Sequence, residues 1–91
     1  MLTIIRSNKF KTDVKKIKNK KDIEELKSVI VALANNQELD AKYKAHQLIG
    51  NYNGYMECHI KPNLLLIYKI DNGELCLYLY RLGSHSMLFK K

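Results

Sequence analysis

The stretch "ECHIKPNLLLIYKIDNGELCLYLYRLGSHSMLF", residues 57–89, decides how this chain folds. It holds two apolar runs of strand length, "LLLIYKI" and "ELCLYLYR", separated by "DNGE". Asn72-Gly73 is the favoured residue pair for a tight type I′ turn, so residues 64–70 and 74–80 are predicted to pair as a β-hairpin. "GYMECHI", just before the hairpin, is predicted to be a further strand of the same sheet.

Two helical patterns precede these strands. Ser7 is predicted to cap the first helix, and Asp22 with Glu25 resembles a capping box that begins the second, which runs to about Ala34. The apolar stripes of the two helices are Phe10, Val14 and Ile17, and Ile23, Leu26, Ile30 and Leu33.

The order of these elements predicts the fold class. "LTII" at 2–5 reads as a short strand, and "HQLIGNYNG" at 46–54 as a short strand and a turn. The overall order β-α-α-β-β-β predicts an α+β fold in a single domain over residues 1–91. Its two amino-terminal helices should pack on one face of an antiparallel sheet.

Side-chain alternation along the strands predicts which residues face the helices and which face outward. The predicted inward set is Met56, Cys58 and Ile60 with Leu75, Leu77 and Leu79, and the outward set is Tyr55, Glu57 and His59 with Tyr78 and Tyr80. Strict alternation would also point Arg81 inward, where an unpaired guanidinium is very costly. We therefore expect the last strand to end, bulge or twist near Arg81 and to turn its side chain toward a cleft.

Composition narrows the class of protein. The chain has 91 residues, of which 46% are hydrophobic and 27% charged, as in ordinary globular domains. No apolar run approaches the roughly 18–20 residues of a membrane span. The two cysteines, Cys58 and Cys76, fit a reduced chain better than a disulfide-bonded secreted one, so the predicted location is cytoplasmic.

The net charge of +7 lies in one segment. Residues 6–21 hold eight basic residues and one acidic residue and account for the whole excess. Such a block attracts polyanions, nucleic acid above all. The alternative is a solvated face that only aids solubility. Lys11, Lys15 and Lys18 share one exposed stripe and are the candidate contacts to RNA.

Two of the three histidines stand at the ends of the strand block. His59 and His85 could act as base and acid in RNA cleavage, and Arg81 could stabilise the phosphorane charge. This reaction needs no cofactor, because the ribose 2′-hydroxyl is the nucleophile. No pair of cysteines or histidines has the spacing of a zinc site, so no metal is predicted.

A family resemblance adds to this reading. "YKAHQLIGNYNGYMECHIKPNLLLIYKI", followed by "YRLGSHSMLF", resembles the RelE superfamily of bacterial toxins, specifically its YafQ-like subgroup. The resemblance implies a toxin of a type II toxin-antitoxin system that enters the ribosomal A site and cuts mRNA there. It also implies a cognate antitoxin that blocks the toxin.

The resemblance also implies a set of active-site positions, which are His46, His59, Arg81, His85 and Phe89. Two residues depart from the subgroup pattern. Asn63 stands where an aspartate is usual, and Leu64 where an aromatic residue often follows. An amide does not exchange protons at neutral pH, so Asn63 is predicted only to bind substrate. The alternative function is a non-catalytic protein of this fold that binds RNA, ribosome or antitoxin.

Overall fold

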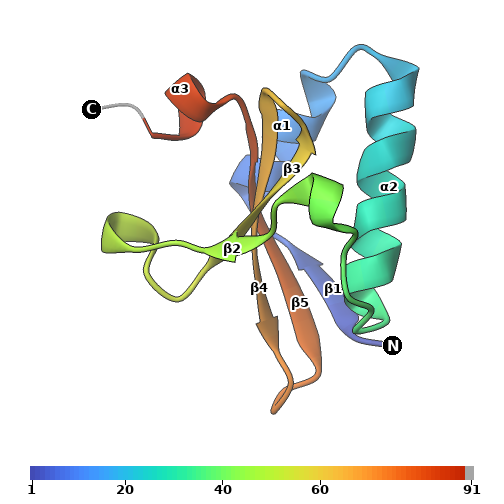
Figure 1. Cartoon of the computed structure of the whole chain (residues 1–91), viewed down its shortest axis with the longest axis vertical. Coiled ribbons are helices and arrows are strands. Elements are labelled where there is room, and N and C mark those ends of the chain that lie inside the picture. The colour runs from blue at the N-terminus through green and yellow to red at the C-terminus, as the bar shows by residue number, and fades with distance from the viewer. Residues whose placement is uncertain (90–91) are drawn as a thin grey trace.

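The computed structural model describes residues 1–89. Its elements are β1 (Thr3–Arg6), α1 (Asn8–Lys15), α2 (Lys20–Ala34), η1 (Ala41–Tyr43), β2 (His46–Gln47), η2 (Gly50–Tyr52), β3 (Met56–Lys61), β4 (Leu64–Asp71), β5 (Cys76–Gly83) and α3 (His85–Leu88). The predicted α+β class is confirmed (Figure 1). No helix among the described residues is long and apolar enough to cross a bilayer.

The sheet has five strands in the order β1-β5-β4-β3-β2. The short strand predicted within 46–54 is confirmed as the two-residue strand β2, which pairs with β3 at the edge, although the predicted order β-α-α-β-β-β did not count it. One detail differs from the prediction. Strand β1 pairs with β5 in parallel, so the sheet is not antiparallel throughout. The whole chain between β1 and β5 serves as the long connection that parallel pairing requires.

Strand β4 is buried on both of its faces. Its even-numbered residues Leu64, Leu66 and Tyr68 pack under α1 and α2, in the cluster that also holds Phe10, Leu26, Val29 and Leu33. Leu65 and Ile67 face the other way and pack with Leu88, Tyr52, Tyr55, Tyr80 and Phe89. The face opposite the helices, which carries the side chains predicted to point outward, is therefore partly covered by α3 and η2 (Figure 1).

The helix boundaries follow their capping residues. The Ser7 hydroxyl accepts a hydrogen bond from the Phe10 amide at 2.9 Å, as predicted. Helix α1 ends at Lys15, so Ile17 and Lys18 lie beyond it, although Ile17 still packs on the core. The prediction of Asp22 as the second cap was wrong.

Asn19 caps α2 instead, because its side-chain oxygen accepts from the Lys21 amide at 2.8 Å. The helix consequently begins at Lys20, and Asp22 lies within its first turn. There the Asp22 carboxylate binds the Lys61 ammonium at 2.7 Å. The side chain of Glu25, the other half of the predicted capping box, accepts a hydrogen bond from the Tyr43 hydroxyl.

The hairpin between β4 and β5 is confirmed, but its predicted turn type was wrong. Asp71 pairs with Cys76, which leaves a loop of four residues, 72–75, where a type I′ turn has two. The Asp71 carboxylate stabilises the wider loop by accepting from the Glu74 amide at 3.1 Å. Leu75 closes the loop at φ +57° and is 62% exposed, so it does not join Leu77 and Leu79 in the core.

The predicted irregularity near Arg81 is confirmed. Ile67 pairs with Arg81 but Tyr68 pairs with Leu79, so Tyr80 is the extra residue of a β-bulge. The Arg81 side chain meets Asp13 of α1, with Nε 2.9 Å from one carboxylate oxygen and Nη2 3.3 Å from the other. The buried Asp13 carboxylate also accepts from the Leu82 amide at 3.0 Å. This carboxylate thus joins α1 to the bulged end of β5.

Replacing Asp13 with alanine should lower the free energy of unfolding by about 2–4 kcal/mol. The change leaves a guanidinium and a buried amide without their acceptor. Urea unfolding followed by far-ultraviolet circular dichroism measures the loss. Asp22→Ala is the matched control, because it breaks an ion pair with a half-exposed lysine and should change stability by less than about 1 kcal/mol. Equal effects of the two changes would contradict the structural role given to Asp13.

Candidate functional site

The strand register brings the predicted site residues to one end of the sheet. His59 pairs with Leu65, and Leu65 pairs with Gly83, so these three residues form one row across β3, β4 and β5. Helix α3, which begins at His85, starts two residues after Gly83. His59 and the start of α3 therefore flank Leu65 on the face opposite α1 and α2.

His46 and His59 meet around the carboxylate of Glu57. His46 lies directly opposite Glu57 in the pairing of β2 with β3, and His59 lies two residues further along β3 on the same face. Both Nε2 atoms approach Glu57 Oε1, at 3.2 Å from His46 and 3.6 Å from His59. The two imidazole rings are 6.3 Å apart between centroids.

Glu57 is the site residue that sequence reasoning missed. It is only 4% exposed, and within residues 1–89 its Oε2 atom accepts no hydrogen bond although it is buried. Alternation placed it on the face that carries His59, but a glutamate on a strand is usually solvated. Only the pairing of β2 with β3 adds His46 and shields the carboxylate from water.

The contacts of His46 occupy both of its ring nitrogens. Nδ1 lies 2.7 Å from the carbonyl oxygen of Lys44. Nε2 lies 3.2 Å from Glu57 Oε1. His59 has one nitrogen toward Glu57. With the proton on that nitrogen, its other nitrogen stays available as an acceptor.

His85 and Phe89 form a second group on α3. Their rings are 4.8 Å apart between centroids, and Phe89 also makes an edge contact with Tyr52 at 5.4 Å. The Tyr52 hydroxyl donates to the Leu88 carbonyl at 3.0 Å and ties α3 to η2. His85 is exposed, while Phe89 is half-buried against the cluster around Leu65. Among the described residues, no ring pair, hydrogen bond or ion pair joins either of these two side chains to His46 or His59.

Arg81 lies in the row of His46 and Glu57 but turns away from them. Ile67 separates it from Glu57, and its guanidinium reaches over the edge of β5 to Asp13. Hydrogen bonds to Asp13 raise the pKa of the Arg81 guanidinium. With 20% of its side chain exposed, Arg81 keeps donors that could meet a phosphate. The Arg81 guanidinium is therefore already paired with a carboxylate, a partner that was not predicted from the sequence.

The remaining predicted substrate-binding residues are exposed and lie outside the histidine cluster. Asn63 occupies the two-residue turn between β3 and β4, where Lys61 pairs with Leu64. Lys11 and Lys15 lie on the outer face of α1, and Lys18 in the link to α2. The structure therefore divides the predicted residues into a histidine–carboxylate cluster, an α3 group and a separate basic surface. Arg81, paired with Asp13, and Asn63, in the turn between β3 and β4, belong to none of these groups.

Within the described part of the chain, neither the cysteines nor a cluster of potential metal-ligating side chains forms a further candidate site. Burial raises the pKa of the Cys58 thiol to about 12, so it is protonated and unreactive at neutral pH. Cys76 is also buried and free. Over residues 1–89, no group of three or more His, Cys, Asp or Glu side chains is arranged to hold a metal ion.

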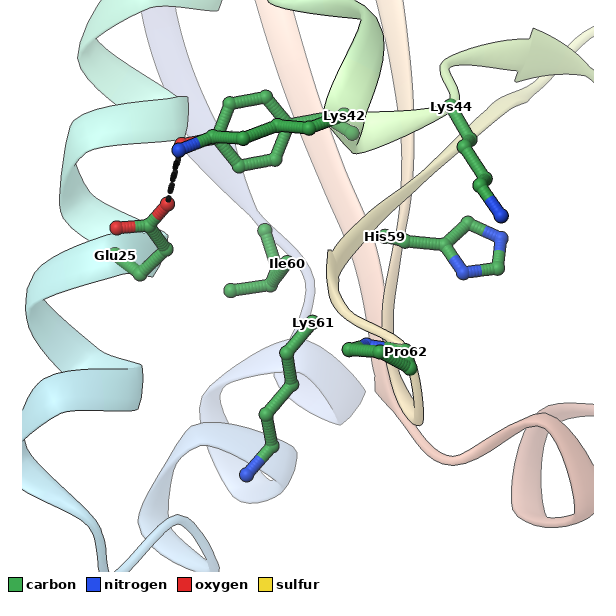
Figure 2. Close-up of a pocket in the computed structure, with 8 residues that line it drawn as sticks. Glu25, Lys42, Lys44, His59, Ile60, Lys61 and Pro62 are labelled. Atoms are coloured by element: carbon green, nitrogen blue, oxygen red, sulfur yellow. Dashed lines mark hydrogen bonds and ion pairs between the residues drawn. The ribbon is translucent and has the colours of Figure 1, made fainter.

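A cleft of about 400 Å³ opens beside His59, between β3 and the η1 segment (Figure 2). Lys42, Lys44 and Lys61 line it together with Tyr43 and Pro62. The Tyr43 hydroxyl donates to Glu25, and this bond raises the pKa of Tyr43 to about 12. This hydrogen bond holds the η1 segment against α2. The η1 segment then forms one wall of the cleft.

Comparison with known proteins places the chain in a family. The family model described as "Bacterial toxin of type II toxin-antitoxin system, YafQ" matches residues 2–90. The mRNA interferase toxin YafQ of Escherichia coli strain K12 is 39% identical over 85 residues, which cover 91% of this chain and 90% of that protein.

Two solved structures are similar over almost their full lengths. A metal-bound toxin from Helicobacter pylori is 50% identical with a TM-score of 0.89, and the match covers 98% of this chain and 100% of that one. In the E. coli DinJ-YafQ complex, a chain that is 37% identical matches with a TM-score of 0.86, over 98% of this chain and 99% of that one. With a family match over nearly its whole length and these relatives, the chain belongs to the YafQ family of bacterial type II toxins.

Proposed function

We propose that this protein is an endoribonuclease that cuts mRNA on the ribosome as the toxin of a type II toxin-antitoxin pair. The observation that carries this proposal is the pair of imidazoles held by one buried carboxylate, at the end of the sheet where α3 presents a third imidazole. This set supplies proton acceptors and donors for a reaction in which the RNA brings its own nucleophile. The relatives named mRNA interferase toxins support the same activity.

In the proposed mechanism, His59 is the base. Its nitrogen that faces away from Glu57 takes the proton of a ribose 2′-hydroxyl, and the 2′-oxygen attacks the neighbouring phosphorus. The bond to the 5′-oxygen of the next nucleotide then breaks, and His85 gives that oxygen a proton. The products are a 2′,3′-cyclic phosphate and a 5′-hydroxyl. Phe89 packs on the His85 ring and orients it.

Glu57 and His46 position the base. The Glu57 carboxylate lies 3.6 Å from His59 Nε2 and favours the tautomer with the proton on that nitrogen. His46 has Nε2 toward Glu57 and Nδ1 toward the Lys44 carbonyl, so in this mechanism it orients Glu57 and is not the base. The donors of Arg81 that do not bind Asp13 stabilise the negative charge that develops on the phosphorane oxygens.

Two macromolecular partners follow from this function. The E. coli relative has been solved in complex with DinJ, which supports a cognate antitoxin for this chain. An acidic segment of that antitoxin would be attracted to the basic residues of 6–21. The same exposed lysines, Lys11, Lys15 and Lys18, would meet ribosomal RNA when the toxin is free.

The alternative function is a non-catalytic protein of this family that binds RNA, ribosome or antitoxin. Asn63 favours it, because it replaces a usual carboxylate with a group that does not titrate. The complete histidine set and the buried Glu57 favour the nuclease. A cleavage assay decides between the two.

Ribosome-bound mRNA should be cut much faster than naked RNA. So small a domain has few groups that could hold a single RNA strand with its 2′-oxygen in line with the bond that breaks. The ribosome can supply this alignment. Primer extension on an mRNA in a translating extract, with and without the protein, measures the cleavage. Cleavage of free RNA at an equal rate would contradict ribosome dependence, and no cleavage in either case would favour the binding protein.

The combined variant Lys11→Ala, Lys15→Ala and Lys18→Ala should bind ribosomes more weakly and with a shallower salt dependence. Each lost phosphate contact removes part of the slope of log affinity against log salt. Lys27→Ala with Lys69→Ala, at exposed positions outside this basic segment, is the charge control. A slope that changes equally in both variants would show a general charge effect and no contact by the basic segment.

His85→Ala should reduce the single-turnover rate on programmed ribosomes by about 10²–10⁴-fold, because it removes the acid. Asn63→Ala should cost less, because it removes only a positioning hydrogen bond. The rates of the two variants on the same mRNA test this division of roles. Greater damage from Asn63→Ala, or wild-type cleavage by His85→Ala, means that the roles are assigned wrongly.

Glu57→Gln should reduce the single-turnover rate by about 10²-fold or more while the fold is retained. The amide keeps the shape of the carboxylate but loses the charge that orients His46 and His59, and removing such an orienting carboxylate from a catalytic histidine is damaging in other enzymes. Circular dichroism and the melting temperature control for folding. A Glu57→Gln protein that cleaves at the wild-type rate would remove Glu57 from the mechanism.

A further inference from the structure

The three lysines of the cleft beside His59 differ in how they are paired. Lys61 binds Asp22 at 2.7 Å and Lys42 lies 3.8 Å from Glu25, and both of these acids belong to α2. The ion pairs found within residues 1–89 do not include Lys44. Its side chain extends toward the His59 ring (Figure 2). Lys44 is therefore the cation of the cleft whose charge is available to a ligand.

The backbone of Lys44 is held in a strained conformation next to the histidine cluster. It has φ +51° and ψ +42°, in the left-handed region that glycine and asparagine adopt more readily than lysine. Its amide donates to the Ala41 carbonyl at 3.0 Å, and its own carbonyl faces His46 Nδ1 at 2.7 Å. Strained residues of this kind cluster at functional sites. The conformation ties the position of Lys44 to that of His46.

We infer that this cleft is a subsite for the RNA backbone, in which Lys44 binds a phosphate adjacent to the one that is cleaved. The inference rests on the proposed nuclease function and assigns it a binding site. The cleft contains His59, so a strand that presents its 2′-hydroxyl to this base would continue past Lys44. At about 400 Å³ the cleft is in the size range of small-ligand sites.

The chemistry of the walls favours a ribose-phosphate unit over an acidic protein segment. Lys44 provides charge at the histidine side, while Lys42 and Lys61 are partly neutralised by the carboxylates of α2. The site thus offers one unpaired cation near a base, which matches one phosphate next to one reacting ribose. A run of glutamates would instead bring several negative charges near Glu25 and Asp22.

The test uses the full chain and a single-stranded RNA hexanucleotide with a 2′-O-methyl group on every ribose, which cannot be cleaved by 2′-hydroxyl attack. The affinity is measured by nuclear magnetic resonance titration over a series of salt concentrations. Lys44→Asn should weaken binding roughly fivefold at about 0.1 M salt and reduce the slope of log affinity against log salt by about 0.7, the value for one phosphate contact on a single strand. Lys44→Arg should keep both the affinity and the salt slope of the wild type.

Lys44→Asn also separates binding from folding. Asparagine adopts the left-handed conformation more easily than lysine, so this variant should melt at or above the wild-type temperature. Lys27→Ala, which removes an exposed lysine of α2 outside the cleft, should leave the salt slope unchanged. An unchanged slope in Lys44→Asn, an equal change in Lys27→Ala, or a wild-type protein that does not bind the hexanucleotide would overturn the site.

Neutral methylphosphonates placed one at a time in the hexanucleotide locate the contact. At one position the neutral group should abolish the difference in affinity between the wild type and Lys44→Asn, because the Lys44 ammonium then has no negative charge to bind. A difference that persists at every position would overturn the assignment. A hexaglutamate peptide that binds as tightly, with the same dependence on Lys44, would assign the cleft to acidic protein segments and exclude an RNA subsite.

These measurements are independent of the cleavage assay. If the wild type does not cut mRNA on ribosomes but Lys44→Asn still weakens binding of the hexanucleotide, the subsite stands and the nuclease function fails. If the wild type cuts mRNA and Lys44→Asn changes neither binding nor the single-turnover rate, the nuclease stands and the subsite fails.

Discussion

Burial of strand β4 on both faces is the constraint on which the rest of the structure depends. A strand whose consecutive residues Leu64 to Tyr68 are all buried needs a cover on each side. Helices α1 and α2 supply one cover, and α3 with η2 supplies the other. The second cover is small and leaves the β2–β3 edge uncovered. The histidine cluster forms at this uncovered edge because His59 lies on the same face as Leu65.

Three cations near the site have carboxylate partners. Asp13 holds Arg81, Asp22 holds Lys61, and Glu25 lies near Lys42. Glu57 is as deeply buried as Asp13, but its carboxylate faces two imidazoles instead of a guanidinium. Around the histidine cluster, the basic side chains outside these three pairs are therefore those of His46, His59 and Lys44. This distribution separates residues that hold the fold together from residues that can act on a ligand.

Local sequence patterns predicted an element where one signal dominated and failed where two signals competed. Ser7 has no rival as a cap for α1, and the prediction held. Asn19 and Asp22 both resemble caps, and the earlier residue begins the helix because its side chain reaches the Lys21 amide. Asn72-Gly73 suggested a two-residue turn, but the Asp71 side chain and the left-handed Leu75 favour a longer loop.

The sequence by itself determined the class of fold, the main helices and strands, and the irregularity at Arg81. Each of these follows from periodicity or from the cost of burying a charge, which act over a few residues. It also indicated the histidines as candidate site residues, through their chemistry and the family resemblance. Only the tertiary structure decided that Asp13 neutralises Arg81, 68 residues away, and that Glu57 joins His46 to His59. These contacts depend on how strands and helices that are distant in the chain are aligned with one another. Local sequence patterns do not predict which side chains such an alignment brings together.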